Sequence, residues 1–306
     1  MQSLKQFVKQ SILQGVKFTG LNRAARYRSR RRLLGLCYHS VLSDGSPVNS
    51  RTNIAVFASE FEKQIALIRD RWNPVSLAEI RSACLENHSL PDYSVLVTFD
   101  DGFRNNVTLA GPILKKYEVP AVVFLTTGQI ENKNLLWPQE IRERIIDGSV
   151  VPSQRKEREV VAETAIAACK KMSQKDRMAY LEELRKTTTL NFELPWKKEL
   201  YEFMSWDEVC QIRQFGVDLG GHTVTHPILS SLNQESLRDE LRLCKKKIES
   251  ALGEVCFSFA YPNGGTVWTS MTPLLKKRNK QDPLPFFHSF FALCAGKIKK
   301  LFSKYR

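Results

Sequence analysis

The sequence has none of the paired cysteines that a disulfide framework or a zinc finger requires. Its seven cysteines are scattered without a C-x-x-C pair, and such a set in a chain of 306 residues is typical of reduced core thiols. Long apolar runs are also missing. No stretch approaches the length of a transmembrane helix, and the first residues lack the apolar segment of a signal peptide. We therefore expect a cytoplasmic protein, or one at the inner face of the cytoplasmic membrane.

Acidic residues are few relative to basic ones. The 46 lysines and arginines exceed the 32 aspartates and glutamates, and the net charge is +14. The excess lies at the two ends of the chain: Arg23, Arg26, Arg28, Arg30, Arg31 and Arg32, and Lys297, Lys299, Lys300, Lys304 and Arg306. Such charge suits nucleic acid, an anionic membrane or an acidic polymer. No zinc-finger spacing or aromatic RNA-binding signature accompanies it, so nucleic acid is the weakest of these interpretations.

Both basic ends also carry apolar residues at helical spacing. Residues 1–18 and 290–305 therefore each predict an amphipathic helix, which either lies on an anionic membrane surface or packs against its own domain. We treat residues 1–32 as a basic amphipathic amino-terminal segment.

The centre of the chain predicts an α/β fold. Residues 95–99 and 121–125 are apolar β-type runs, and a helical segment at 109–117 lies between them. A strand, a helix and a strand within about thirty residues form a βαβ unit, which implies a parallel sheet. An earlier buried strand is expected over residues 33–39.

Periodic segments predict further elements along the chain. They are helices over 57–71 and 236–252, helices opened by capping boxes at Ser76 and Ser205, and strands over 217–219 and 255–261. Residues 138–204 differ in being charged and mostly helical, with no convincing strand. We interpret them as a helical insertion in the same domain.

Two adjacent carboxylates, Asp100 and Asp101, follow the first of the central strands, and Gly102 comes directly after them. In α/β folds, the loops at the carboxyl ends of strands carry the chemistry. Neighbouring acids repel each other unless a cation or a shared proton offsets their charge. The pair therefore indicates either a metal site or a turn that caps the next helix.

Two histidines lie four residues apart after a later strand. In a helical turn, this spacing would put the imidazoles of His222 and His226 on one side, where zinc, cobalt or iron could bind them together with a carboxylate. Gly220 and Gly221 precede them and let the backbone pass close to a site.

Four motifs resemble those of the polysaccharide deacetylase family, the NodB-homology or carbohydrate esterase 4 group. They are Leu36-Cys37-Tyr38-His39-Ser40-Val41 (the Y-H-x-V strand of one branch), Thr98-Phe99-Asp100-Asp101-Gly102 (T-F-D-D-G), His222-Thr223-Val224-Thr225-His226-Pro227 (H-[ST]-x-x-H-P) and Phe259-Ala260-Tyr261-Pro262-Asn263-Gly264 (F-A-Y-P-x-G). They occur in the family's order. The resemblance implies a distorted (β/α) barrel over residues 33–265, with the helical insertion at about 138–204.

The resemblance also implies a reaction: the metal-dependent removal of N-acetyl groups from an amino-sugar polysaccharide or oligosaccharide, in exopolysaccharide or cell-wall production. By position, Asp100 corresponds to the general base that activates the attacking water. Asp101, His222 and His226 correspond to the ligands of a divalent metal, for which we expect zinc, with cobalt, nickel and iron as alternatives. The backbone amide at the position of Asn263 would face the oxyanion.

His39 belongs to the first motif, and in its branch this position lines the site. It could act as a general acid or orient the substrate, or it could be a structural histidine. We count it with Asp100 and Asn263 among the candidate catalytic residues.

Two features depart from the family pattern. Ala260 stands where the wider family has an arginine, an absence that the F-A-Y-P branch shares. Residues 266–306 look too short for the family's last helix, strand and catalytic motif, so the barrel could be incompletely closed. Leu284-Pro285 is followed by Phe286 in place of the branch's arginine, and His288 is a candidate late acid. Two alternatives therefore stay open: a non-catalytic saccharide-binding relative, and a peripheral membrane or polyanion-binding protein.

Overall fold

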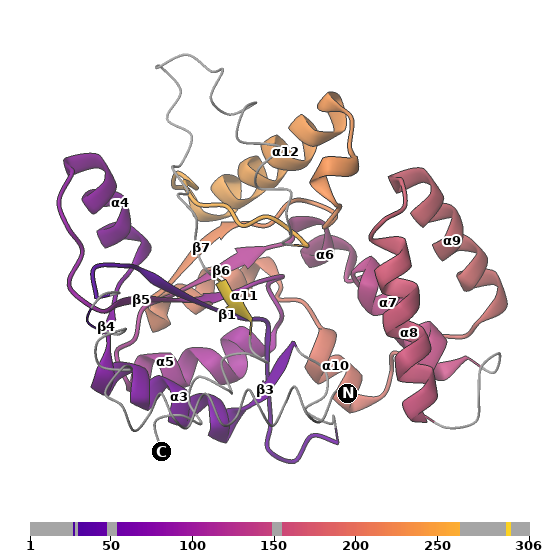
Figure 1. The fold of residues 1–306 in the computed structure, drawn as a ribbon, viewed down its shortest axis with the longest axis horizontal. Helices are drawn as coiled ribbons and strands as arrows, with labels where there is room; N and C mark the ends of the chain where they lie inside the picture. The colour runs from indigo at the N-terminus through magenta and orange to yellow at the C-terminus, as the bar shows by residue number, and fades with distance from the viewer. Residues whose placement is uncertain (1–26, 28–29, 48–53, 149–154, 264–291, 295–306) are drawn as a thin grey trace.

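The computed structural model describes residues 27, 30–47, 54–148, 155–263 and 292–294 (Figure 1). Most of the two basic ends lies outside these ranges. The amphipathic helix expected over 1–18 and the candidate acid His288 therefore stay predictions. The helix expected over 290–305 is wrong at Ala292–Cys294, because the backbone of these residues pairs as a parallel strand with residues 35–37; the rest of that segment lies outside the described residues.

A parallel sheet forms the centre of the molecule (Figure 1). Its strands, in spatial order, are β7 (Val217–Gly221), β6 (Ala121–Leu125), β5 (Ser94–Phe99), β1 (Leu34–Tyr38) and β8 (Ala292–Cys294), and the short β4 (Asn73–Pro74) pairs with the start of β5. Every pairing is parallel. The apolar strands are buried on both faces, as strands of parallel sheets usually are. The expected α/β class is confirmed.

The register places the carboxyl ends of the central strands side by side. Phe99 at the end of β5 pairs with Tyr38 at the end of β1 and with Val123 of β6, while Leu125 pairs with Gly221 at the end of β7. Residues that follow β1, β5 and β7 therefore meet at one edge of the sheet. A separate two-stranded sheet, β2 (Ser40–Leu42) and β3 (Ala55–Phe57), lies just beyond β1.

Helices cover the sheet (Figure 1). They are α3 (Ala58–Arg71), α4 (Leu77–Glu86), the π-turn η1 (Asn106–Ala110), α5 (Gly111–Lys116), α6 (Thr127–Asn132), α11 (Trp206–Gln211), the 3-10 turns η2 (Ile212–Phe215) and η3 (Leu229–Ser231), and α12 (Gln234–Leu252). The capping boxes at Ser76 and Ser205 are both present. Apolar side chains of the strands pack against these helices, with the rings of Tyr38, Phe61 and Phe99 in mutual contact.

Residues 137–201 supply four more helices beside this core. They are α7 (Trp137–Asp147), α8 (Arg155–Cys169), α9 (Gln174–Thr187) and α10 (Pro195–Tyr201), and Figure 1 shows α7, α8 and α9 together at one side of the molecule. They have an apolar cluster of their own. Lys197 is fully buried, with its ammonium 2.9 Å from Glu143 and 2.5 Å from Asp147. The helical character expected for this stretch is confirmed; that it is an insertion in the domain stays a proposal.

The expected strand over residues 255–261 is wrong. In its backbone pairing within the described residues, this segment forms an isolated bridge between Phe259 and Gly221, where Gly221 N–H donates to Ser258 O and Ala260 N–H donates to Gly221 O. The ladder stops there because the carbonyl of Ala260 accepts a hydrogen bond from a side chain, His222 Nδ1, instead of a strand amide.

Candidate metal centre and active site

Asp101 lies directly beyond β5 in a backbone conformation that few residues adopt. Its φ is 77° and that of Gly102 is 87°. A Cβ on Gly102 would come within 2.9 Å of Leu125 Cδ2, so glycine is required on both steric and conformational grounds. The Asp101 carbonyl accepts a hydrogen bond from Thr126 N–H at the end of β6. The tight turn directs the Asp101 carboxylate into the protein, where the residue is only 3% exposed.

His222 and His226 are brought together by a loop, not by the helical turn that the sequence suggested. His222 N–H donates to Leu125 O beside the end of β7, and the following Thr223 and His226 have positive φ angles of 73° and 58°. His226 N–H donates to Thr223 Oγ1 at 3.1 Å, which closes the loop. A Cβ at Gly220 would lie 2.6 Å from a ring carbon of Phe124, so the glycine allows β7 to pack closely against β6. That Gly220 and Gly221 let the backbone pass close to a site stays a prediction.

Two side chains from other elements hold this loop. Glu240 of α12 accepts hydrogen bonds from Val224 N–H at 2.7 Å and Thr225 N–H at 3.0 Å, and from the Thr225 hydroxyl. Trp137 of α7 donates its indole N–H to the His226 carbonyl at 3.2 Å. Sequence reasoning missed both residues, because neither has a fixed spacing to the histidine motif.

The three predicted metal ligands form one buried cluster. Asp101 Oδ1 lies 3.6 Å from His222 Nε2 and 3.4 Å from His226 Nε2. His222 Nδ1 lies 3.0 Å from the Ala260 carbonyl, which can only accept a hydrogen bond. Nδ1 of His222 therefore carries the proton, and the lone pair of its Nε2 faces Asp101.

The electrostatics of this cluster favour a cation. Burial, and secondarily the charge of Asp100, raises the pKa of the Asp101 carboxyl well above its usual value. Burial also lowers the pKa of both His222 and His226, so the imidazoles are neutral and can act as ligands. Asp101 Oδ1 is buried and has no hydrogen-bond partner among the described residues. An ionised Asp101 beside two neutral imidazoles would lack a countercharge, which a bound cation would supply.

The spacing of these atoms fits a divalent transition metal. Bonds of about 2.0–2.2 Å in a tetrahedral zinc site separate the ligand atoms by about 3.3–3.6 Å. The two Asp101–imidazole separations fall in or near this range, and the three ligand atoms lie within 4.8 Å of one another. Two imidazoles and one carboxylate are a donor set that zinc, cobalt, nickel and iron accept.

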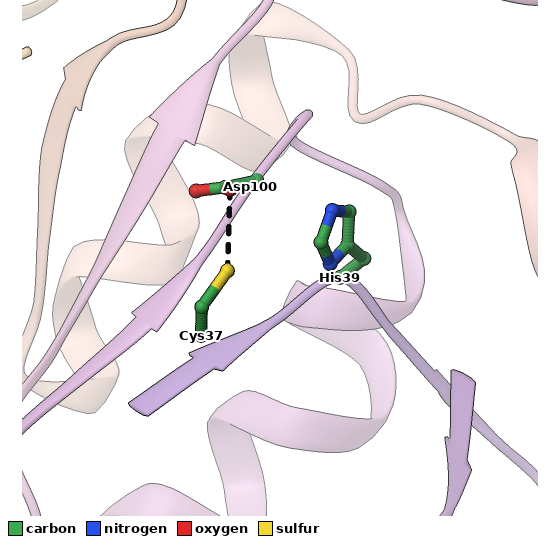
Figure 2. Close-up of side chains that lie close together, drawn as sticks. All are labelled: Cys37, His39 and Asp100. Atoms are coloured by element: carbon green, nitrogen blue, oxygen red, sulfur yellow. Dashed lines mark hydrogen bonds between the residues drawn. The ribbon is translucent and has the colours of Figure 1, made fainter. Parts of the chain in front are cut away.

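Asp100 lies close to two residues at the end of β1, Cys37 and His39 (Figure 2). The Cys37 thiol donates a hydrogen bond to Asp100 Oδ2 at 3.2 Å, and His39 lies beside them. Burial lowers the pKa of His39, although the charge of Asp100 opposes this effect. The predicted candidates His39 and Asp100 therefore come together. Cys37, expected to be a core thiol, is an addition that the sequence analysis missed.

Asn263 follows three residues after the carbonyl that orients His222. It adopts a left-handed backbone with φ of 55°, and its Nδ2 is buried without a hydrogen-bond partner in the described part of the chain. Its role at the oxyanion stays a prediction.

Comparison with known proteins agrees with this combination of a parallel α/β fold and a histidine–aspartate cluster. The family model described as polysaccharide deacetylase matches residues 87–279, more than half of the chain. The chain therefore belongs to the polysaccharide deacetylase family, and the family resemblance of its motifs is confirmed.

Two curated relatives match parts of the chain. YxkH of Bacillus subtilis, whose name assigns it to the polysaccharide deacetylases, is 30% identical over 119 residues, which is 39% of this chain and 40% of that protein. The poly-β-1,6-N-acetyl-D-glucosamine N-deacetylase of Escherichia coli is 39% identical over 70 residues, 22% of this chain and 10% of that protein. The matches thus cover less than half of either relative.

Two solved structures share the fold. The deacetylase PplD of Streptococcus pyogenes, in complex with acetate, is 17% identical with a TM-score of 0.54, over 90% of this chain and 98% of that one. IcaB from Ammonifex degensii is 19% identical with a TM-score of 0.53, over 89% and 96% of the two chains. The likeness confirms the barrel-like α/β fold that the motifs implied.

Proposed function

We propose that this protein is a metal-dependent hydrolase that removes N-acetyl groups from an amino-sugar polysaccharide or oligosaccharide. The observation that carries the proposal is the buried cluster of Asp101, His222 and His226, with Asp100 as the next residue, in a member of the polysaccharide deacetylase family. Each of these residues stands at the position where the family motifs have the corresponding group.

Asp101, His222 and His226 would hold the metal, for which we propose zinc. When bound, the cation would polarise the amide carbonyl and lower the pKa of a neighbouring water. Asp100 takes the proton from this water as the water oxygen attacks the carbonyl carbon. The carbon–nitrogen bond then breaks, acetate leaves, and the amine nitrogen receives a proton. The backbone N–H of Asn263 would donate to the oxyanion, the role that its position in the third motif suggests.

His39 has two roles open to it. It could protonate the leaving amine, or it could orient the sugar. Burial lowers the pKa of His39 and keeps the imidazole neutral, which suits a hydrogen bond to the sugar. To act as the proton donor, His39 would first have to receive the proton that the neighbouring Asp100 takes from water, and then pass it to the amine nitrogen. The ratio of kcat to KM effects in a His39→Ala variant would distinguish a proton donor from a residue that only binds substrate.

The name of the Escherichia coli relative directs the choice of substrate. That protein is a poly-β-1,6-N-acetyl-D-glucosamine N-deacetylase, so β-1,6-linked N-acetylglucosamine oligomers are the first substrate to test. An exopolysaccharide of this type is the substrate class that we propose.

Acetate release tests the proposal. The chain is stripped of metal with a chelator, reloaded with one equivalent of zinc, cobalt, nickel or iron, and incubated with N-acetylglucosamine oligomers. We expect acetate from the reloaded protein and none from the stripped protein. Metal binding without acetate release from any N-acetylated oligomer would contradict the proposal and favour the non-catalytic saccharide-binding alternative.

Membrane contact stays a separate prediction. It concerns residues 1–32 and the carboxyl-terminal tail, most of which lie outside the described ranges. Among the helices that the structure does describe, none combines the length and apolar character needed to cross a membrane.

A further inference from the structure

A second group of metal-ligating side chains lies beside the proposed catalytic centre. Cys37, His39 and Asp100 each offer one ligand atom, and these atoms all lie within 4.8 Å of one another. Figure 2 shows the three side chains converging where β1 and β5 end. The group shares no residue with the cluster of Asp101, His222 and His226.

The thiol is the best-placed member of this group. Cys37 is buried, and its Sγ lies 3.2 Å from Asp100 Oδ2, with the S–H donating to the carboxylate. In a tetrahedral site, bonds of about 2.0–2.3 Å separate a sulfur and an oxygen ligand by about 3.6 Å. The sulfur and the oxygen are thus already close to the spacing that a shared cation needs.

The imidazole supplies a nitrogen that accepts or donates no hydrogen bond within the described residues. His39 Nδ1 is buried and has no hydrogen-bond partner within the described ranges. The backbone of His39 is held in place, because Asn106 Nδ2 donates to its carbonyl at 2.7 Å. A ring nitrogen of His39 already lies within 4.8 Å of the ligand atoms of Cys37 and Asp100.

The donor set selects the kind of cation. A thiolate, an imidazole and a carboxylate favour zinc, cobalt and cadmium over magnesium or calcium, which prefer oxygen ligands alone. Three protein ligands are enough for a tetrahedral ion whose fourth position stays open.

We propose that Cys37, His39 and Asp100 form a second site for a thiophilic divalent cation of the zinc class. On binding, the S–H bond of Cys37 breaks, a sulfur–metal bond forms, and the proton is released to solvent. The ion also binds the Asp100 carboxylate, which can then no longer accept a proton. If Asp100 is the general base of the proposed function, on which this consequence rests, the second ion inhibits hydrolysis.

Cobalt tests the site independently of activity, because a cobalt–thiolate bond has a charge-transfer absorption band that imidazole and carboxylate ligands do not produce. Metal-free full-length protein is titrated with Co²⁺. We expect two ions per chain, with the thiolate band developing as the second ion binds. Cys37→Ser should lose the band and one ion, while Cys84→Ser, which changes an exposed cysteine outside the cluster, should keep both.

His222→Ala separates the two sites. This variant should lose one ion and retain the thiolate band. Absence of the band in the unchanged protein would overturn the proposal, as would a band that survives Cys37→Ser. Cys37→Ser replaces the thiol by a hydroxyl of similar size, which can still donate a hydrogen bond to Asp100. Circular dichroism of Cys37→Ser checks that this variant is folded.

Acetate release at increasing zinc tests the inhibition. The ratio of the rate at a large excess of zinc to the rate at one equivalent should be well below one in the unchanged protein and should rise toward one in Cys37→Ser. If the ratio of the two rates is the same in Cys37→Ser as in the unchanged protein, the second site does not cause the inhibition by zinc. If no variant releases acetate under any condition, the proposed function fails, while the cobalt titration still decides whether the second site exists.

Discussion

Asp101 combines burial, a left-handed backbone and an unpaired carboxylate oxygen. Each of these features costs free energy in the folded protein without metal. Together they are the pattern expected of a residue whose environment is completed by a cation. Its neighbour Asp100 has a different environment, because it is half-buried and accepts a hydrogen bond from the Cys37 thiol. It can therefore take a different role.

The raised pKa of Asp101 makes the metal-free protein sensitive to pH. Above the ordinary pKa of 3.8, the folded protein retains a proton that the unfolded chain has lost, so stability falls as pH rises toward the higher folded pKa. The lowered histidine pKa values act in the opposite direction but only below about pH 6.5. Asp101→Asn removes the first effect alone. Without metal, we expect this variant to gain stability relative to the unchanged protein as pH rises above about 4.

Urea unfolding of both metal-free proteins across this pH range measures the difference. A constant difference in the free energy of unfolding would show that Asp101 titrates normally and would contradict the electrostatic account of the site.

His226 should be required for stabilisation by zinc. A ligand that binds only the folded state stabilises it by about 2.7 kcal/mol at a concentration 100 times its Kd. The comparison is made in the Cys37→Ser background, so that the proposed second site does not contribute. We therefore expect zinc to raise the Tm of the Cys37→Ser protein and to have little effect once His226→Ala is added. His88→Ala is the matched control, because this histidine is exposed and lies outside both clusters. Equal zinc-induced shifts in the two variants would rule out His226 as a ligand.

At the scale of elements, the site residues follow the ends of strands, and side chains of two helices form hydrogen bonds to the histidine loop. β5 supplies Asp100 and Asp101, β7 leads into the histidine loop, and β1 leads to His39. Glu240 of α12 then fixes the loop through two backbone amides and one hydroxyl. A carboxylate with three such contacts restricts where the two imidazoles can lie.

Replacement of Glu240 should therefore loosen the metal site. Outer contacts that orient metal ligands typically contribute about 10–100-fold in metal affinity. We expect Glu240→Ala to weaken zinc binding by about this factor, and to lower the free energy of unfolding by about 1–2 kcal/mol because the Val224 amide loses its partner. Glu240→Gln, which keeps an acceptor oxygen, should recover part of both losses.

Competition with a chromophoric chelator measures the zinc affinity. Glu235→Ala is the control, because Glu235 is an exposed residue in the first turn of the same helix. If Glu235→Ala and Glu240→Ala bind zinc equally well, the contacts of Glu240 do not position the ligands.

At the scale of the whole molecule, the sequence was enough to bring Asp101, His222 and His226 together as candidates, but not to find the residues that support them. Asp101 and the two histidines follow apolar strands within short motifs, so local patterns are enough to find them. Trp137 and Glu240 reach the loop from helices whose distance along the chain follows no spacing rule. Cys37 contacts Asp100 only because β1 and β5 pair in register, which the sequence does not specify.

The wrong strand over residues 255–261 has a related cause. Its apolar residues suit a strand, but the carbonyl of Ala260 accepts a hydrogen bond from His222. This contact depends on the tertiary position of β7, which local sequence patterns do not reveal. The helix boundaries were predicted more closely: α3 and α12 begin and end within two residues of their expected limits, because caps and periodicity are local.

The separation of roles between Asp100 and its neighbour is the central claim. At one equivalent of zinc, we expect Asp100→Asn to contain as much zinc as the unchanged protein, because Asp101, His222 and His226 are intact. Its rate of acetate release from β-1,6-linked N-acetylglucosamine oligomers should fall by a factor of about 10²–10⁴, the usual contribution of a general base. Zinc-loaded Asp100→Asn that releases acetate at the rate of the unchanged protein would contradict the account.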